Sequence, residues 1–215
     1  MSGEFQGRES KMSKVGAGVQ SLIRQDQYAN ILTSQGLPPM ADLAVNRKLF
    51  IASSAAGTNL APVIVPLTTA AKWLLFNPTD SGKMVIPLLM WAVLESGTRA
   101  IGSSLWACVT QAAEATAPTA YASSLNKGLG HVATPSTIFA GGVTLDASEV
   151  WACLAGRDTL ADANESSIMT ADLSAGLFTV PAGRSFAMSM RDSAAGTTPL
   201  YGGGFIYAEF ALDRS

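Results

Sequence analysis

The chain has 215 residues, 48% of them hydrophobic and 14% charged, with a formal net charge of −2, whereas an average soluble domain carries about 25% charged residues. This apolar content excludes disorder along the whole chain, and the longest uncharged apolar run, residues 84–94, is too short to span a bilayer as a helix. The slightly negative charge also argues against a protein that binds nucleic acid mainly through its phosphates, so we expect neither a membrane nor nucleic acid as a partner.

Residues 1–48 are predicted to form an N-terminal arm that is extended apart from short helical turns. Such turns are expected at 19–31 and at 40–48, where Pro38 and Pro39 precede the helix start. The first residues lack the basic-then-apolar order of a signal peptide, so we expect the protein not to be exported and to be assembled in the cytoplasm where it is made. A segment that cannot bury itself commonly gains order on a partner, and a disordered tail is the alternative. The basic residues of the arm are Arg8, Lys11, Lys14, Arg24, Arg47 and Lys48.

From residue 49 to residue 215 the pattern changes to short apolar runs separated by turn-forming residues. This pattern is typical of an all-β sandwich or barrel, and no long helical pattern interrupts it. We therefore predict one β-domain over residues 49–215, with strands at 49–53, 63–69, 72–76, 84–94, 104–112, 136–140, 149–155, 176–180, 185–191 and 205–212.

The faces of these strands differ in how much burial they require. In residues 185–191, Ser185, Ser189 and Arg191 alternate with apolar residues and would lie on the opposite face of a strand. This alternation predicts a strand with one buried and one exposed face. Residues 84–94 and 105–109 are instead apolar on both faces, and Pro87 predicts an edge position or a bulge. Two apolar faces need a second covering layer, which we expect a neighbouring subunit to supply; the arm or a long loop is the alternative.

Several short motifs punctuate the β-domain. Residues 77–82 and 181–183 are clusters of turn formers and are predicted to be hairpin connections. Gly202, Gly203 and Gly204 precede a predicted strand rather than a helix, so close backbone packing or a flexible loop explains them better than a dinucleotide site. Cys108 and Cys153 lie inside apolar runs, which predicts two reduced, buried thiols.

None of the motifs for catalysis or cofactor binding is complete. Residues 81–83, Ser-Gly-Lys, lack the earlier glycine and the following Ser or Thr of a phosphate-binding loop. The single histidine, His131, lies in a glycine-rich loop and is predicted to be a solvated residue rather than a catalytic base. The acidic run at 158–165 offers oxygen ligands for calcium but matches no EF-hand spacing. We predict that the protein is not an enzyme and has no catalytic residues, no metal-binding residues and no cofactor.

Residues 73–86, Trp-Leu-Leu-Phe-Asn-Pro-Thr-Asp-Ser-Gly-Lys-Met-Val-Ile, resemble the signature of a group of tailed-bacteriophage virion proteins, in which Asn-Pro-x-x-Ser-Gly-Lys precedes an aliphatic strand. In that group an arm with a stretch similar to Arg24-Gln25-Asp26 precedes the β-domain, and the last strand carries an acidic residue, here Glu209. The resemblance implies a virion structural protein with an antiparallel β-sandwich of jelly-roll type that assembles symmetrically on the particle. No catalytic residue comes with it.

These observations together lead us to expect a head decoration or cement protein located in the virion. It would form a homo-oligomer, a trimer, and bind the major capsid protein or other virion proteins. A tail, neck or fibre-attachment protein of the same fold is the close alternative. A carbohydrate-binding β-sandwich is another, with Trp73, Trp91, Trp106 or Trp151 as a stacking platform, although their positions in strands favour core packing. The residues expected at the interface with other copies or with the shell are Arg8, Lys11, Lys14, Arg24, Met84, Ile86, Leu88, Met90 and Trp91.

Overall fold

The structure is a computed structural model, which describes residues 39–55, 59–63, 67–98, 102–114, 116–121, 124–156, 168–192 and 199–212. Apart from one short helix, α1 (Pro39–Val45), the regular elements in these ranges are strands. The strands are β1 (Leu49–Ser54), β2 (Ala70–Phe76), β3 (Lys83–Ser96), β4 (Ser104–Val109), β5 (Ser124–Gly128), β6 (Ile138–Thr144), β7 (Ala152–Gly156), β8 (Ile168–Asp172), β9 (Ser185–Arg191) and β10 (Leu200–Ala211).

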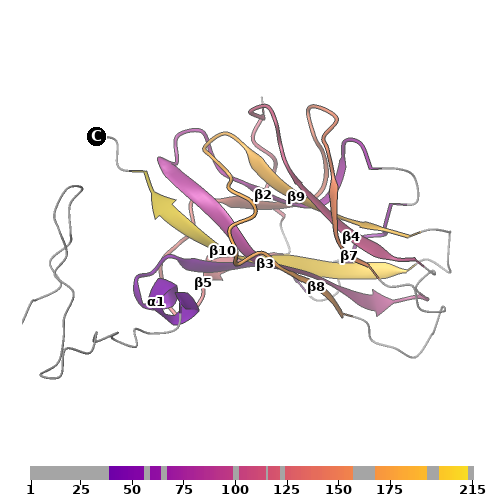
Figure 1. The fold of residues 1–215 in the computed structure, drawn as a ribbon, viewed down its shortest axis with the longest axis horizontal. Coiled ribbons are helices and arrows are strands. Elements are labelled where there is room, and N and C mark those ends of the chain that lie inside the picture. The colour runs from indigo at the N-terminus through magenta and orange to yellow at the C-terminus, as the bar shows by residue number, and fades with distance from the viewer. Residues whose placement is uncertain are drawn as a thin grey trace, which may run out of the picture. The chain divides into compact units, whose positions relative to one another are not determined.

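The strands form two five-stranded antiparallel sheets that pack face to face (Figure 1). The first sheet has the order β5-β1-β10-β3-β8 and the second sheet the order β6-β2-β9-β4-β7. Strands β1, β2, β3 and β4 pair with β10, β9, β8 and β7 respectively, as if one long antiparallel ribbon had been rolled up. Pairs β10·β3 and β4·β9 close the roll. This is the double-sheet jelly roll, and the predicted all-β sandwich of jelly-roll type is confirmed.

The strands β5 and β6 are an addition to the eight strands of the roll. They lie in sequence between β4 and β7, and each extends one sheet at its β1 or β2 edge. The predicted strands include neither β5 nor β8, because both are edge strands of five residues whose apolar side chains are interrupted by polar ones. Two predicted strands are absent as strands in the described residues: 63–69 and 176–180 contribute only single bridges, at Val63 and Val180.

The core lies between the two sheets and is rich in aromatic side chains. Fully buried members include Trp73 and Phe186 from the second sheet and Tyr201, Phe205 and Tyr207 from the first. Phe205 packs edge-on against Phe186, with ring centroids 5.4 Å apart. These rings fill the space between the two sheets.

The outer face of the first sheet is covered at one end by α1, which overlaps the predicted helical range 40–48 but begins one residue earlier, at Pro39. Leu43 and Ala44 of the helix pack against Leu49, Leu88 and Ala208 of the sheet. The chain's own helix therefore supplies part of the covering layer that the apolar strands require. The helical turn predicted at 19–31 lies outside the described residues.

The outer face of the second sheet is covered by loops of the same chain. Leu145 and Trp151 pack with Leu74, Cys108 and Ala187 in a separate cluster on this face. Ser185 and Ser189 are fully buried, so the prediction of a half-exposed strand at 185–191 is wrong. That prediction failed because β9 is a central strand, flanked by β2 and β4, and its outer face is packed rather than solvated.

The two predicted hairpin turns are in fact crossovers between the sheets. Residues 77–82 join β2 of the second sheet to β3 of the first, and residues 181–183 lead from the Val180 bridge on β3 back to β9. Asn77, fully buried, ties the two crossovers together: its side-chain amide donates to the carbonyl oxygens of Lys83 and Val180, both at 2.9 Å. Ser81 Oγ donates to Asn77 Oδ1 at 2.7 Å. The Asn-Pro-x-x-Ser-Gly-Lys segment is thus a structural brace.

Candidate functional surfaces

A buried carboxylate connects the brace to the last strand. Glu209 of β10, with a side chain 1% exposed, forms an ion pair with Lys83 Nζ at 2.5 Å. Its two oxygens also accept hydrogen bonds from the backbone N–H groups of Ser136 and Thr137 and from Ser136 Oγ. These contacts give Glu209 a structural role, in which it holds the segment before β6 against β10 and β3.

The same cluster continues through two hydroxyl groups. Tyr207 OH donates to Asn126 Oδ1 at 2.7 Å and lies 2.5 Å from Thr137 Oγ1, while Asn126 Nδ2 donates to the carbonyl oxygen of Thr137. Burial is the main reason that the pKa of Tyr207 lies well above its ordinary value. Tyr207 therefore stays protonated at physiological pH and acts as a fixed hydrogen-bond donor.

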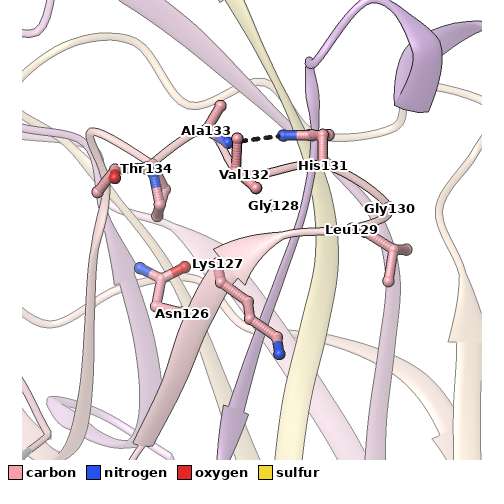
Figure 2. A pocket seen from close by; sticks show the side chains of 10 residues that line it. Asn126, Lys127, Gly128, Leu129, Gly130, His131, Val132, Ala133 and Thr134 are labelled. Atoms are coloured by element: carbon pink, nitrogen blue, oxygen red, sulfur yellow. Dashed lines mark hydrogen bonds between the residues drawn. The ribbon is translucent and has the colours of Figure 1, made fainter.

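A hollow of about 760 Å³ lies in the loop between β5 and β6 and is lined by residues 126–135 (Figure 2). His131 Nδ1 accepts the backbone N–H of Ala133 at 3.2 Å, and Nε2 lies 2.7 Å from the carbonyl oxygen of Leu49. With Nδ1 as acceptor, the proton sits on Nε2 and is donated to Leu49. The ring also packs edge-on against Phe50. His131 is thus half-buried and bonded at both nitrogens, a structural residue rather than the solvated one predicted.

Carboxylates gather on the loops above the second sheet but form no metal centre. Glu114 Oε2 accepts the backbone N–H of Asp146, and Glu149 Oε1 accepts that of Gln111 at 3.0 Å. Burial raises the pKa of Glu114. No group of three or more His, Cys, Asp or Glu side chains suited to a metal ion occurs within the described ranges. The predicted acidic loop at 158–165 lies outside them.

The predicted interface residues of β3 have different surroundings. A β-bulge at Leu88, next to Pro87, shifts the register with β10: Tyr207 pairs with Pro87 and Ile206 with Leu89. The core-facing residues therefore switch from odd-numbered positions before the bulge, such as Val85, to even-numbered positions after it, such as Met90. Met84, Ile86 and Trp91 remain half-buried on the outer face.

Two of those residues have to be withdrawn from the predicted interface. Met90 has no exposed surface and lies in the core, and Leu88 is 7% exposed beneath α1. Simple alternation along 84–94 placed both with Met84 and Ile86, and the bulge breaks that alternation. The four arm residues Arg8, Lys11, Lys14 and Arg24 lie outside the part of the chain that the structure describes.

Beyond α1, the described residues leave a half-exposed apolar face on the first sheet, defined here as Ile51, Leu89, Trp91, Val93 and Ile206. The strand register aligns Ile51, Ile206 and Leu89 in one row across β1, β10 and β3, and all five side chains are half-exposed. A groove of about 200 Å³ joins this face to the start of α1, with Met40, Leu88 and Leu129 among its lining residues.

The four tryptophans divide between core and surface. Trp73 is fully buried, as predicted. Trp91 lies on the apolar face and Trp106 lines a separate hollow on the second sheet, so core packing is wrong for these two. Trp151 lines the same hollow but also packs against the buried cluster on the outer face of that sheet. Strand position alone did not reveal this, because each ring points away from the space between the sheets.

The two cysteines are free, but only Cys108 is buried. Their strands are neighbours, with Cys153 opposite Trp106 rather than Cys108. Cys153 is exposed because β7 is an edge strand, which corrects the prediction of two buried thiols. Burial, with a smaller contribution from Glu149 and Glu114, raises the pKa of Cys108 to about 12.

We expect one thiol per chain to react with a disulfide reagent in the native protein at pH 8. Only the thiolate reacts, and with a pKa of about 12 the thiolate fraction of Cys108 at pH 8 is on the order of 10⁻⁴. Ellman titration should give one equivalent in buffer and two in denaturant, and Cys153→Ser should abolish the native reaction. Two rapid equivalents in buffer would contradict the burial of Cys108.

Fold and surfaces together define the class: a jelly-roll β-sandwich with a filled interior, one apolar sheet face and one hollow lined by aromatic and charged side chains. Within the described residues, no helix has the length and apolar character needed to cross a membrane. Comparisons of the chain with protein-family models, with curated proteins and with solved structures found no match.

Proposed function

We propose that the chain is a structural protein of a tailed-bacteriophage particle, a head decoration or cement protein that forms a homotrimer on the capsid shell. The observation that carries the proposal is the apolar face on the outer surface of a jelly roll. The resemblance of residues 73–86 to phage virion proteins points the same way. Two features on which this resemblance depends lie together in the fold: Lys83 of the signature segment forms an ion pair with Glu209, the acidic residue of the last strand.

The architecture narrows the kinds of binding that are open to the protein. Double-sheet jelly rolls occur in viral capsid proteins, in lectins and in cupins. A ligand between the sheets is disfavoured here, because Trp73, Phe186 and Phe205 fill that space. Binding is left to the outer surfaces, where shell subunits and other protein partners dock.

The apolar face has the character of a subunit contact. Its central row consists of aliphatic side chains on three adjacent strands, and exposed apolar residues flank it: Leu125 on β5 is 39% exposed and Ile168 on β8 is 56% exposed. Contiguous apolar surface of this kind is usually covered by a partner. In the proposal, copies of the chain bury it, and the basic arm lies across seams between capsid subunits.

Light scattering after size-exclusion chromatography tests the oligomer. We expect a trimer for the wild type and a monomer for Leu89→Glu, because a charge at the centre of the apolar face cannot be desolvated cheaply. Val132→Glu is the matched control: Val132 is 94% exposed in the β5–β6 loop, and the trimer should persist. Ile168→Glu, at the more exposed rim, replaces Leu89→Glu if that variant does not fold.

Binding to the particle is tested separately by co-sedimentation with expanded capsid shells that lack the protein. The wild type should sediment with the shells, and a stable monomer that stays in the supernatant would overturn the proposal. A tail, neck or fibre-attachment protein of the same fold is the alternative location. Labelled protein imaged on intact particles at low resolution distinguishes these places.

A further inference from the structure

The hollow on the second sheet, called here the tryptophan pocket, is built by four separate segments. It has a volume of about 200 Å³ and is lined by Leu67, Trp106, Glu149, Trp151 and Arg191. Trp106 belongs to β4 and Arg191 to β9, while Glu149 and Trp151 precede β7. Strand pairing of β4 with both β9 and β7 brings these side chains together.

The two indole rings are held in place by their own N–H groups. Trp106 Nε1 donates to Ser104 Oγ at 2.8 Å, and Trp151 Nε1 donates to the carbonyl oxygen of Thr68 at 3.0 Å. Both rings remain half-exposed. Because each N–H is already used, a ligand in the pocket would contact the apolar surface of the half-exposed rings, which suits the C–H groups of a ring-shaped molecule.

The charged residues of the pocket keep unused hydrogen-bonding capacity. Arg191 Nε and Glu149 Oε2 are buried and have no hydrogen-bond partner. They do not pair with each other, since the ion pair in the described residues is Lys83–Glu209. Leaving such a group unsatisfied costs about 1–3 kcal/mol, so sites of this kind call for an explanation such as a bound molecule.

The combination of groups selects a neutral ligand. The positive charge of Arg191 repels a cationic ligand, and the negative charge of Glu149 repels an anionic one. Two adjacent hydroxyl groups, in contrast, can accept a hydrogen bond from the guanidinium and donate one to the carboxylate. A pyranose ring carries such hydroxyls at its edge and C–H groups on its face. The volume of the pocket suits a single ring, and a few polar groups within an aromatic lining are typical of small-molecule sites.

We propose that the tryptophan pocket binds one neutral pyranose residue of a glycan, stacked on Trp106 or Trp151 with its hydroxyls at Glu149 and Arg191. This activity is separate from assembly, because the pocket lies on the second sheet and the apolar face on the first. A particle protein with such a pocket would bind neutral saccharides at a surface distinct from its subunit contacts.

A glycan array probed with the full chain, followed by titration of the best neutral oligosaccharide, tests the proposal. We expect binding to glycans with neutral terminal sugars, and a loss of affinity of tenfold or more in Trp151→Ala and in Glu149→Gln. Glu149→Gln keeps the shape of the side chain, so it remains informative if Trp151→Ala does not fold. Val132→Ala is the control, because Val132 is 94% exposed in the β5–β6 loop and belongs to neither the tryptophan pocket nor the apolar face, so saccharide binding should be unchanged.

Three results would overturn the proposal: no glycan bound at millimolar concentration, binding confined to charged glycans, or affinity unchanged in both pocket variants. Chromatography of the same variants separates this inference from the proposed assembly. If Trp151→Ala dissociates the oligomer and no glycan binds, the tryptophan pocket is a subunit contact instead. Failure of Leu89→Glu to dissociate the protein would contradict the apolar-face assembly and leave the sugar site intact.

Discussion

Glu209→Gln should lower the free energy of unfolding by about 2–3 kcal/mol, because it removes the negative charge that Lys83 and three other donors share. The amide can still accept some of these bonds, but its own N–H₂ group would face the donors of Ser136 and Lys83. Lys83 is 32% exposed, so water compensates part of the loss, and the effect stays below that of a fully buried pair. For a chain of this length the corresponding fall in Tm is about 5–10 °C.

Urea denaturation measures the effect, with the midpoint expected to fall and the m-value to stay constant. Asp80→Asn is the matched control: Asp80 is an exposed carboxylate in the turn before β3, and its neutralisation should change stability by less than about 0.5 kcal/mol. Equal effects of the two substitutions would show that the Glu209 cluster contributes nothing specific to the fold.

Gly204→Ala should destabilise the protein by about 3 kcal/mol, because β10 has no room for a side chain at this position. A Cβ atom there would overlap the carbonyl oxygen of Ala52 on the paired strand β1. It would also lie 2.5 Å from Trp91 Cζ2 and 2.9 Å from Ser53 Cα. Two of these three atoms belong to backbone at the centre of the sheet, so they cannot move without disturbing the pairing of β1 with β10.

Gly156→Ala provides the comparison within another strand. Its Cβ would meet atoms no closer than 3.8 Å, an ordinary contact, so stability should change by less than about 0.5 kcal/mol. Thermal unfolding followed by circular dichroism distinguishes the two variants. A Gly204→Ala protein as stable as wild type would mean that β10 and β1 are not packed as described.

The three glycines of β10 illustrate how far the sequence could lead. Close backbone packing was one of the two explanations open for them, and Gly203 indeed faces the Trp73 ring, with its Cβ position 2.9 Å from Cε2. Their place before the last strand was wrong, since β10 begins at Leu200. A run of glycines indicates that a side chain would not fit at these positions. Whether the run lies in a loop or in a strand depends on the neighbouring strands, which the sequence does not identify.

The candidate surfaces were less predictable than the fold. Lys83 and Glu209 are 126 residues apart in the chain, and no local spacing connects them. Trp106 and Trp151 lie in strand-like sequence that resembles core sequence, and only the loops and the neighbouring strands decide that their rings line a surface hollow. Likewise, the inward positions of β3 depend on a bulge that pairing with β10 reveals.

By itself, the sequence determined that this is an all-β protein, because its apolar runs have the length of strands, are separated by turn formers and show no long helical pattern. It also singled out residues 73–86, in which a cluster of turn formers separates two apolar strands. Tertiary structure decided which faces are covered, because burial is a property of neighbours and not of the run itself. In the described residues, the rolled pairing of β1–β4 with β10–β7, together with α1 and the loops over the second sheet, leaves the apolar face and the tryptophan pocket at the surface.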